Sequence, residues 1–200
     1  EKTIFDLIDE WDDEDDYKGA SSMQEGRIIK TFQTNGVDTT FRWPCAADLD
    51  AFIEMHRTLT REEVMCRRLD LDRDSGRMMF EDIVHDLRQD KLGYILVEQD
   101  GRLVGEGFTN SSGYQYFTVG LALIDRVRGM GIGTALMWTL EEESRRLGAR
   151  RLFLSVWSAN PSAVHVYEKV GYNECGRRSR WVQMDDGSEC DMIDMVKLDI

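Results

Sequence analysis

The sequence predicts a mixed α/β domain with a central, mostly antiparallel sheet, one parallel pair of strands and flanking helices. Two observations favour this fold. Strand-like runs at 93–98, 102–110 and 115–124 follow one another through short polar turns, as antiparallel strands do. A strand, a glycine-rich turn, a helix and a further strand then follow between residues 115 and 157, and such a unit implies parallel pairing with a right-handed crossover.

Length and composition indicate one domain of ordinary size. The chain has 200 residues, of which 42% are hydrophobic, so it can bury a real core. It holds no apolar window of about 18 residues, and its first thirty residues lack the apolar segment of a signal peptide. Its four cysteines are widely spaced, without a C-x-x-C pair, which fits neither a disulfide framework nor a zinc site. We therefore expect a cytoplasmic protein with reduced thiols, no membrane partner and no bound metal.

The formal charge of −13 argues against nucleic acid as a partner. An acidic surface would attract a cationic substrate such as an amine. Acidity that serves only solubility explains the same composition, so the charge alone does not choose between these two explanations.

Residues 1–37 are predicted to be an N-terminal extension, and residues 38–200 the main domain. The extension has apolar residues at helical spacing up to Trp11, which favours a short helix, and then an acidic linker over 12–16. An additional strand over 27–33 would form a hairpin with 37–43, because Asn-Gly at 35–36 is a strong turn signal.

Two helices should follow, one over 46–56 and another from residue 61 onward. Four acidic residues in the second region have the spacing of a calcium loop, namely Asp70, Asp72, Asp74 and Glu81. Ser75 stands where that loop needs glycine, and Arg77 where it needs an aliphatic side chain. We therefore expect a polar turn, with an acidic residue capping a helix that runs to about residue 90.

Leu136, Leu140 and Leu147 are expected to share one face of a helix over 134–147. The pairs Glu141–Arg145 and Glu142–Arg146 should lie on its outside, and a glycine cap should end it. A strand over 151–157 comes next. Asn160-Pro161 then starts another helix, because Asn is a good N-cap and Pro suits the first helical turn. Strands over 173–184 and 190–198 complete the sheet.

The glycine-rich turn at 128–133 is the strongest functional signal in the chain. Gly129, Gly131 and Gly133 lack Cβ atoms and stand just before a helix, where free backbone N–H groups and the helix dipole favour an anion such as phosphate. The turn does not fit a dinucleotide fingerprint, because Leu136 occupies the third glycine position, and it is not a P-loop. A glycine-rich connection without any ligand would look similar.

The pattern R-x-x-G-x-G at 128–133 resembles the acetyl-CoA pyrophosphate loop of the GNAT superfamily of N-acetyltransferases. A second pattern, Asn160-x-x-Ala163-x-x-x-Tyr167-x-x-x-Gly171-Tyr172, is similar to another motif of that superfamily and follows at the expected place. The two motifs together are far more specific than either alone. The resemblance extends over about residues 38–200, including the order of the elements.

The resemblance implies transfer of an acetyl group from acetyl-CoA directly to a primary amine, on a small molecule or on a protein N terminus or lysine. It also implies that two central parallel strands splay apart to admit the pantetheine arm. Gly120, inside an otherwise apolar strand, is consistent with a bulge that would allow this, and a glycine required by packing is the alternative. The residues that it assigns to acetyl-CoA are Leu121, Ala122, Leu123, Arg128, Gly129, Met130, Gly131, Ile132, Gly133, Thr134, Asn160 and Tyr167.

Tyr167 matches the position of the general acid that protonates the leaving thiolate, and its hydroxyl has a suitable ordinary pKa of about 10. Many members of the superfamily carry a glutamate base where this chain has Thr118. We therefore expect Glu106, on the neighbouring strand, to remove the amine proton, with His56 as a weaker alternative.

Two other functions stay open at this point. A non-catalytic domain that binds acetyl-CoA as a sensor or scaffold would keep the glycine turn without needing Tyr167. Another acyl donor, such as succinyl-CoA, would use the same loop. The acceptor amine is not identified, and a homodimer is compatible with the sequence.

Overall fold

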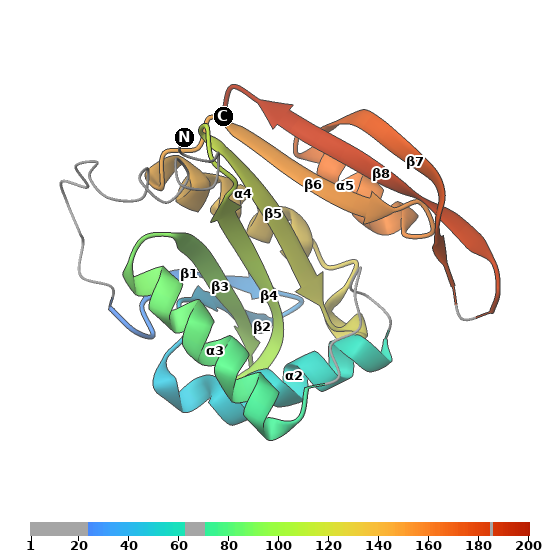
Figure 1. The fold of residues 1–200 in the computed structure, drawn as a ribbon. Coiled ribbons are helices and arrows are strands. Elements are labelled where there is room, and N and C mark those ends of the chain that lie inside the picture. The colour runs from blue at the N-terminus through green and yellow to red at the C-terminus, as the bar shows by residue number, and fades with distance from the viewer. Residues whose placement is uncertain (1–23, 63–70, 185) are drawn as a thin grey trace, which may run out of the picture.

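The computed structural model describes residues 24–62, 71–184 and 186–200 (Figure 1). The predicted N-terminal helix and acidic linker lie outside the described residues. So do Asp70 and the helical turns expected after residue 62.

One eight-stranded sheet organises the chain, in the order β1-β2-β3-β4-β5-β6-β8-β7. All neighbouring strands are antiparallel except β5 and β6, which are parallel, so the predicted fold class is confirmed. The strands are β1 (Ile28–Thr34), β2 (Val37–Arg42), β3 (Leu92–Gln99), β4 (Arg102–Ser111), β5 (Tyr116–Leu123), β6 (Arg151–Trp157), β7 (Asn173–Gln183) and β8 (Glu189–Leu198).

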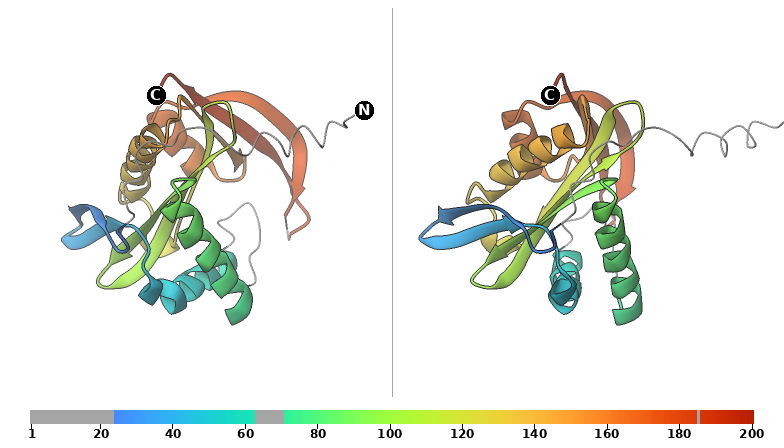
Figure 2. Two further views of the ribbon diagram at one scale, coloured as in Figure 1. Left: turned by 60° about the vertical axis from the view of Figure 1, so that its left-hand side comes forward. Right: turned by 90° about the vertical axis from the view of Figure 1, so that its left-hand side faces the viewer.

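Helices cover both faces of this sheet. The helical elements are η2 (Ala46–Asp48), α2 (Leu49–Arg61), α3 (Arg73–Arg88), η3 (Asp125–Val127), α4 (Ile132–Arg146) and α5 (Pro161–Lys169). Helices α2 and α3 lie on one face and α4 and α5 on the other (Figure 2). Fully buried side chains such as Phe52 of α2 and Leu136 and Leu140 of α4 fill the two layers between helices and sheet.

Two tight turns set the antiparallel order of the first four strands. Asn35 and Gly36 connect β1 to β2, and Asp100 and Gly101 connect β3 to β4, all four with positive φ. Such φ pairs match the twist of a two-residue hairpin. The predicted additional strand, β1, is therefore the outer strand of the sheet, although the domain boundary at residue 38 itself stays a prediction.

The helix caps follow the sequence signals. The Asp72 carboxylate accepts a hydrogen bond of 2.8 Å from the Ser75 N–H and so caps α3, as expected for a polar turn. Asn160 caps α5 through the Ala163 N–H at 3.1 Å. Gly148, with φ +93°, follows the end of α4.

An irregularity in the β3–β4 pairing changes which side chains share a face. Val97 pairs with Gly105, but Glu98 pairs with Leu103, so Val104 is an extra residue in β4. One extra residue moves the rest of the strand to the opposite face. As a result Tyr94 stands opposite Phe108 and on the same face as Glu106.

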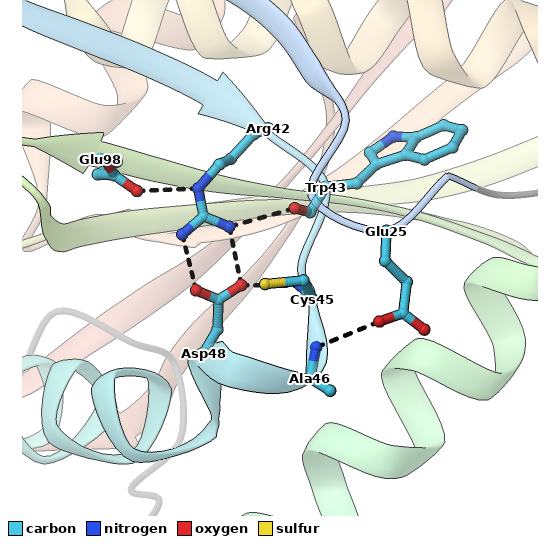
Figure 3. A network of polar contacts seen from close by, with 7 residues as sticks. All are labelled: Glu25, Arg42, Trp43, Cys45, Ala46, Asp48 and Glu98. Carbon is cyan, nitrogen blue, oxygen red and sulfur yellow. Dashed lines mark hydrogen bonds and ion pairs between the residues drawn. The ribbon is translucent and has the colours of Figure 1, made fainter.

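A buried polar network ties β2 and β3 to the turn before α2 (Figure 3). Both terminal nitrogens of Arg42 donate to the Asp48 carboxylate at 2.7 Å, and its Nε donates to Glu98 at 2.9 Å. Burial alone would raise the pKa of Asp48. The hydrogen bonds from Arg42 and from the Cys45 N–H outweigh that effect, and the pKa of Asp48 is lowered. Glu25 holds the same turn by accepting from the Ala46 N–H.

One surface prediction for α4 is wrong. Glu141 was expected on the outside of the helix, but it is 3% exposed and binds Lys197 of β8 as well as Arg145. Arg146 pairs with Glu143 and Asp90 rather than with Glu142. The i,i+4 spacing concerns contacts within one helix, so it could not predict that Lys197 of β8 reaches Glu141.

Candidate active site

Strands β5 and β6 separate shortly after they meet. Their parallel pairing covers Tyr116–Arg151, Phe117–Leu152 and Thr118–Phe153 and does not continue within these two fully described strands. Figure 1 shows the two strands diverging from that point. A cavity of about 1220 Å³ opens there, lined by residues 118–123 of β5 and by Phe153, Ser155, Val156 and Trp157 of β6. On its other side β5 stays paired with β4, so only the edge toward β6 is open.

The glycine turn borders this cavity. Gly129, Gly131 and Gly133 line it, and Gly131 is the N-cap of α4. Gly129 and Gly131 have φ of +71° and +82°, and a Cβ added to either would meet nothing within 4 Å. The turn thus combines a left-handed backbone with open space in front of a helix N-terminus, which suits a phosphate group.

Arg128 fixes the start of the turn. Its Nε donates to the Leu123 carbonyl at 2.8 Å, and its Nη2 pairs with Glu62 at 2.5 Å. Glu62 also accepts from the Asp125 N–H at 2.8 Å. The guanidinium therefore joins the end of β5 to the end of α2, while the residue still lines the cavity.

Most of the residues assigned to the cofactor do line the cavity. These are Leu121, Ala122, Leu123, Arg128, Gly129, Gly131, Gly133, Thr134, Asn160 and Tyr167. Ile132 instead has a fully buried side chain in the core, and Met130 is 38% exposed outside the lining. Any part that these two residues play in binding would have to come from their backbone groups.

Gly120 does not mark a bulge, contrary to the expectation. The register between β4 and β5 is continuous, and Gly120 pairs with Phe108. A Cβ at residue 120 would lie 2.5 Å from the Phe108 ring. The glycine is there because the aromatic ring of the neighbouring strand crosses it.

Tyr167 projects from α5 toward the same cavity. Its side chain is 7% exposed and lines the cavity wall, and its ring lies 6.1 Å from that of Tyr172. Tyr172 does not line the cavity, and burial, aided by the nearby Glu141, raises the pKa of its hydroxyl well above the ordinary value.

The two candidate bases are brought together. Glu106 lines the cavity with 6% exposure, and its Oε2 lies 2.9 Å from Nε2 of the fully buried His56 on α2. The Tyr94 hydroxyl donates a hydrogen bond to the same oxygen. Thr118, at the position where the superfamily often has glutamate, lines the cavity and contacts the Ser112 hydroxyl at 3.0 Å.

The β6 side of the cavity was not predicted from the sequence. Ser155 donates to Asp194 of β8 at 2.6 Å, and Arg178 of β7 donates to the same carboxylate oxygen at 2.6 Å. Burial opposes ionisation of Asp194, but these two donors prevail and lower its pKa. Alternation along β6 could have placed Phe153, Ser155 and Trp157 on one face, yet nothing in the sequence said that this face borders the cavity.

Helix α5 forms another part of the cavity wall. Asn160, Pro161, Ser162, His165 and Lys169 line it there. Within the described residues no group of three His, Cys, Asp or Glu side chains is arranged to hold a metal ion. None of the described helices is both long and apolar enough to cross a membrane.

A sequence model of the acetyltransferase (GNAT) family matches residues 52–172. Among curated proteins, the uncharacterized N-acetyltransferase YdgE of Bacillus subtilis is 33% identical over 109 residues, which are 54% of this chain and 63% of that protein. Streptothricin acetyltransferase of Streptomyces lavendulae is 31% identical over 112 residues, or 55% of this chain and 59% of that one. The chain thus spans about three fifths of the length of these two relatives.

Solved structures show the same fold at low identity. A GNAT-family acetyltransferase from Streptococcus pneumoniae superposes with a TM-score of 0.71 at 19% identity, covering 80% of this chain and 99% of that one. A phosphinothricin acetyltransferase from Sinorhizobium meliloti, solved in complex with acetyl-CoA, gives a TM-score of 0.69 at 20% identity over 80% of this chain and 88% of that one.

Proposed function

This chain belongs to the acetyltransferase (GNAT) family, and we propose that it moves the acetyl group of acetyl-CoA directly to a primary amine. The observation that carries the proposal is the cavity between the splayed β5 and β6, which joins an open strand edge to the glycine turn. A relative named as an N-acetyltransferase, a second named as an acetyltransferase and a structural neighbour solved with acetyl-CoA support it.

The cavity suits the parts of acetyl-CoA one by one. The pyrophosphate would bind the backbone N–H groups of the turn at Gly129–Gly133, where the open space at Gly129 and Gly131 leaves room for its oxygens. The amides of the pantetheine arm would pair with the free edge of Leu121–Leu123, as an added strand does. Asn160 and the residues after it on α5 would flank the other side of the arm.

The reaction needs one proton donor and one proton acceptor. The amine nitrogen attacks the thioester carbonyl carbon, a C–N bond forms, and the resulting oxyanion is stabilised by a backbone N–H of β5. The C–S bond then breaks. Tyr167 gives its proton to the leaving thiolate, and Glu106 takes the proton that the amine loses. Both side chains return to their starting states by exchange with solvent.

Thiol release from acetyl-CoA across a panel of amines tests this proposal. The panel holds polyamines, aminoglycosides, amino acids, and peptides with a free N terminus or lysine, because the acceptor is not identified by the cavity. Release above the hydrolytic background with one class supports the proposal and names the acceptor class. Tight binding of acetyl-CoA without release with any amine would favour a sensor or scaffold and overturn the enzymatic proposal.

Substitution of Gly131 by valine tests the phosphate site. Valine at φ +82° is strained and would fill the space in front of α4, so we expect acetyl-CoA affinity to fall at least about 100-fold. Gly36→Val is the matched control, because Gly36 has φ +80° and equally open surroundings in the β1–β2 turn. Equal affinity of the two variants, measured by calorimetry, would exclude the turn as the phosphate site.

A further inference from the structure

Two neighbours hold the Glu106 carboxylate at the same oxygen. The Tyr94 hydroxyl donates to Oε2, and Nε2 of His56 lies 2.9 Å from that same atom. The side chain also lines the cavity. Since both neighbours use Oε2, Oε1 is the oxygen of this carboxylate that is left for a ligand.

The surroundings of Glu106 contain no compensating cation. Helix α2 presents His56, and β3 presents Tyr94. Strand β5 presents Ala122 directly opposite, and α3 lines the same side of the cavity with Met79 and Ile83. Within the described part of the chain no lysine or arginine lies at ion-pair distance from Glu106, so only Tyr94 and His56 orient it.

We propose that Tyr94 and His56 are positioning residues, which hold Glu106 through Oε2 so that Oε1 faces the incoming amine and takes its proton. This inference rests on the proposed function. Placing a base to within a fraction of an ångström is what makes proton transfer efficient, and a carboxylate that rotates freely in a wide cavity would lose that advantage.

The surroundings of the two ring nitrogens indicate which tautomer of His56 places an N–H beside Glu106. Nδ1 is buried and has no hydrogen-bond partner among the described residues. A buried N–H without an acceptor is costly, so the tautomer with its proton on Nε2 suits the site best. Nε2–H then lies beside the carboxylate, 2.9 Å from Oε2, without full hydrogen-bond geometry.

Kinetics of variants in two backgrounds test the inference. We expect Tyr94→Phe and His56→Leu each to lower kcat about tenfold while acetyl-CoA affinity stays within about twofold. His56→Gln keeps an N–H donor near the Nε2 position and should retain more activity than His56→Leu. In a Glu106→Gln background, neither Tyr94→Phe nor His56→Leu should cause any further loss, because both act through Glu106.

The same tenfold losses in the Glu106→Gln background would overturn the inference, since they would show that Tyr94 and His56 act independently of the carboxylate. So would a loss of thermal stability with unchanged kcat.

Nitrogen-15 NMR of the histidine rings separates failure of this inference from failure of the proposed function. The chain has three histidines, so the His56 signals can be assigned by substitution. We expect the Nε2–H tautomer in the wild-type protein and a changed Nε2 shift in Glu106→Gln, whether or not any amine is acetylated. An Nδ1–H tautomer, or a shift that ignores Glu106→Gln, would overturn the inference even in an active enzyme.

Discussion

Glu106 and Glu141 are both almost fully buried, but they lie on opposite faces of the sheet and have different interaction partners. Glu141, on α4, binds Lys197 at 2.5 Å and also Arg145, and it does not line the cavity. Glu106, on β4, has a tyrosine hydroxyl and a histidine as its polar partners among the described residues, and it borders the cavity.

The difference distinguishes a buried carboxylate that a cation compensates from one that has no cation beside it among the described residues. A buried charge is tolerated when a cation compensates its lost hydration, so Glu141 is explained by the packing of β8 against α4. A buried carboxylate without a cation, at the wall of a cavity, has no such explanation, and groups of that kind concentrate at active sites. The comparison predicts opposite responses to the same substitution.

The largest expected effect is on catalysis. Glu106→Gln should lower kcat at least about 100-fold, the usual contribution of a general base, while the thermal midpoint changes little. Glu141→Gln should leave kcat near the wild-type value but lower stability, because Lys197 loses its partner. Steady-state thiol release and thermal unfolding of both variants measure the two effects.

Activity lost equally in both variants, or stability lost mainly in Glu106→Gln, would contradict the comparison. Glutamine keeps the size of glutamate, so neither result could be attributed to a cavity in the core.

The next largest effect is on stability alone. Lys197→Met removes the cation from Glu141 but keeps the length of the side chain, which also lies over the Trp138 ring at 4.5 Å. Breaking a buried ion pair by removing one partner costs about 3 kcal/mol. Chemical denaturation should show that loss in the free energy of unfolding. Pairing the variant with Glu141→Leu should restore most of it, and a double variant no more stable than Lys197→Met would argue against a buried ion pair.

Asp48 is a third buried carboxylate and should behave as Glu141 does. Its pKa is lowered in the folded state, so its contribution to stability is present above the ordinary aspartate pKa and is lost as the pH falls through the folded value. We expect stability to decline below about pH 4, and to decline less steeply in Asp48→Asn. Urea unfolding between pH 7 and pH 3 measures both slopes. Identical slopes would mean that Asp48 does not contribute.

The fold could be read from the sequence because its signals are local. Asn35-Gly36 and Asp100-Gly101 specify two-residue turns, and Asn160-Pro161 specifies a helix start. Each such signal acts over a few residues and does not depend on the rest of the molecule. The glycine turn and Tyr167 were found in the same way, as parts of short motifs.

The surroundings of the proposed base, Glu106, could not be predicted from the sequence in the same detail. A two-residue turn at Asp100-Gly101 predicts a register that puts Tyr94 and Glu106 on opposite faces, and only the extra residue Val104 brings them to the same one. The contact between His56 and Glu106 joins residues 50 positions apart in the sequence, through the packing of α2 on β4. No short-range pattern encodes either relation.

The most direct test of the account is acetyl transfer by Tyr167→Phe beside its neighbour Tyr172→Phe. Tyr172 is the matched control because its buried hydroxyl has no hydrogen-bond partner among the described residues and does not reach the cavity. With an amine that the wild-type protein acetylates, we expect Tyr167→Phe to release thiol about 100-fold more slowly at unchanged acetyl-CoA affinity, and Tyr172→Phe to match the wild type. Equal rates in the two variants, or a loss of acetyl-CoA binding that accounts for the whole effect, would contradict the assignment of Tyr167 as the acid.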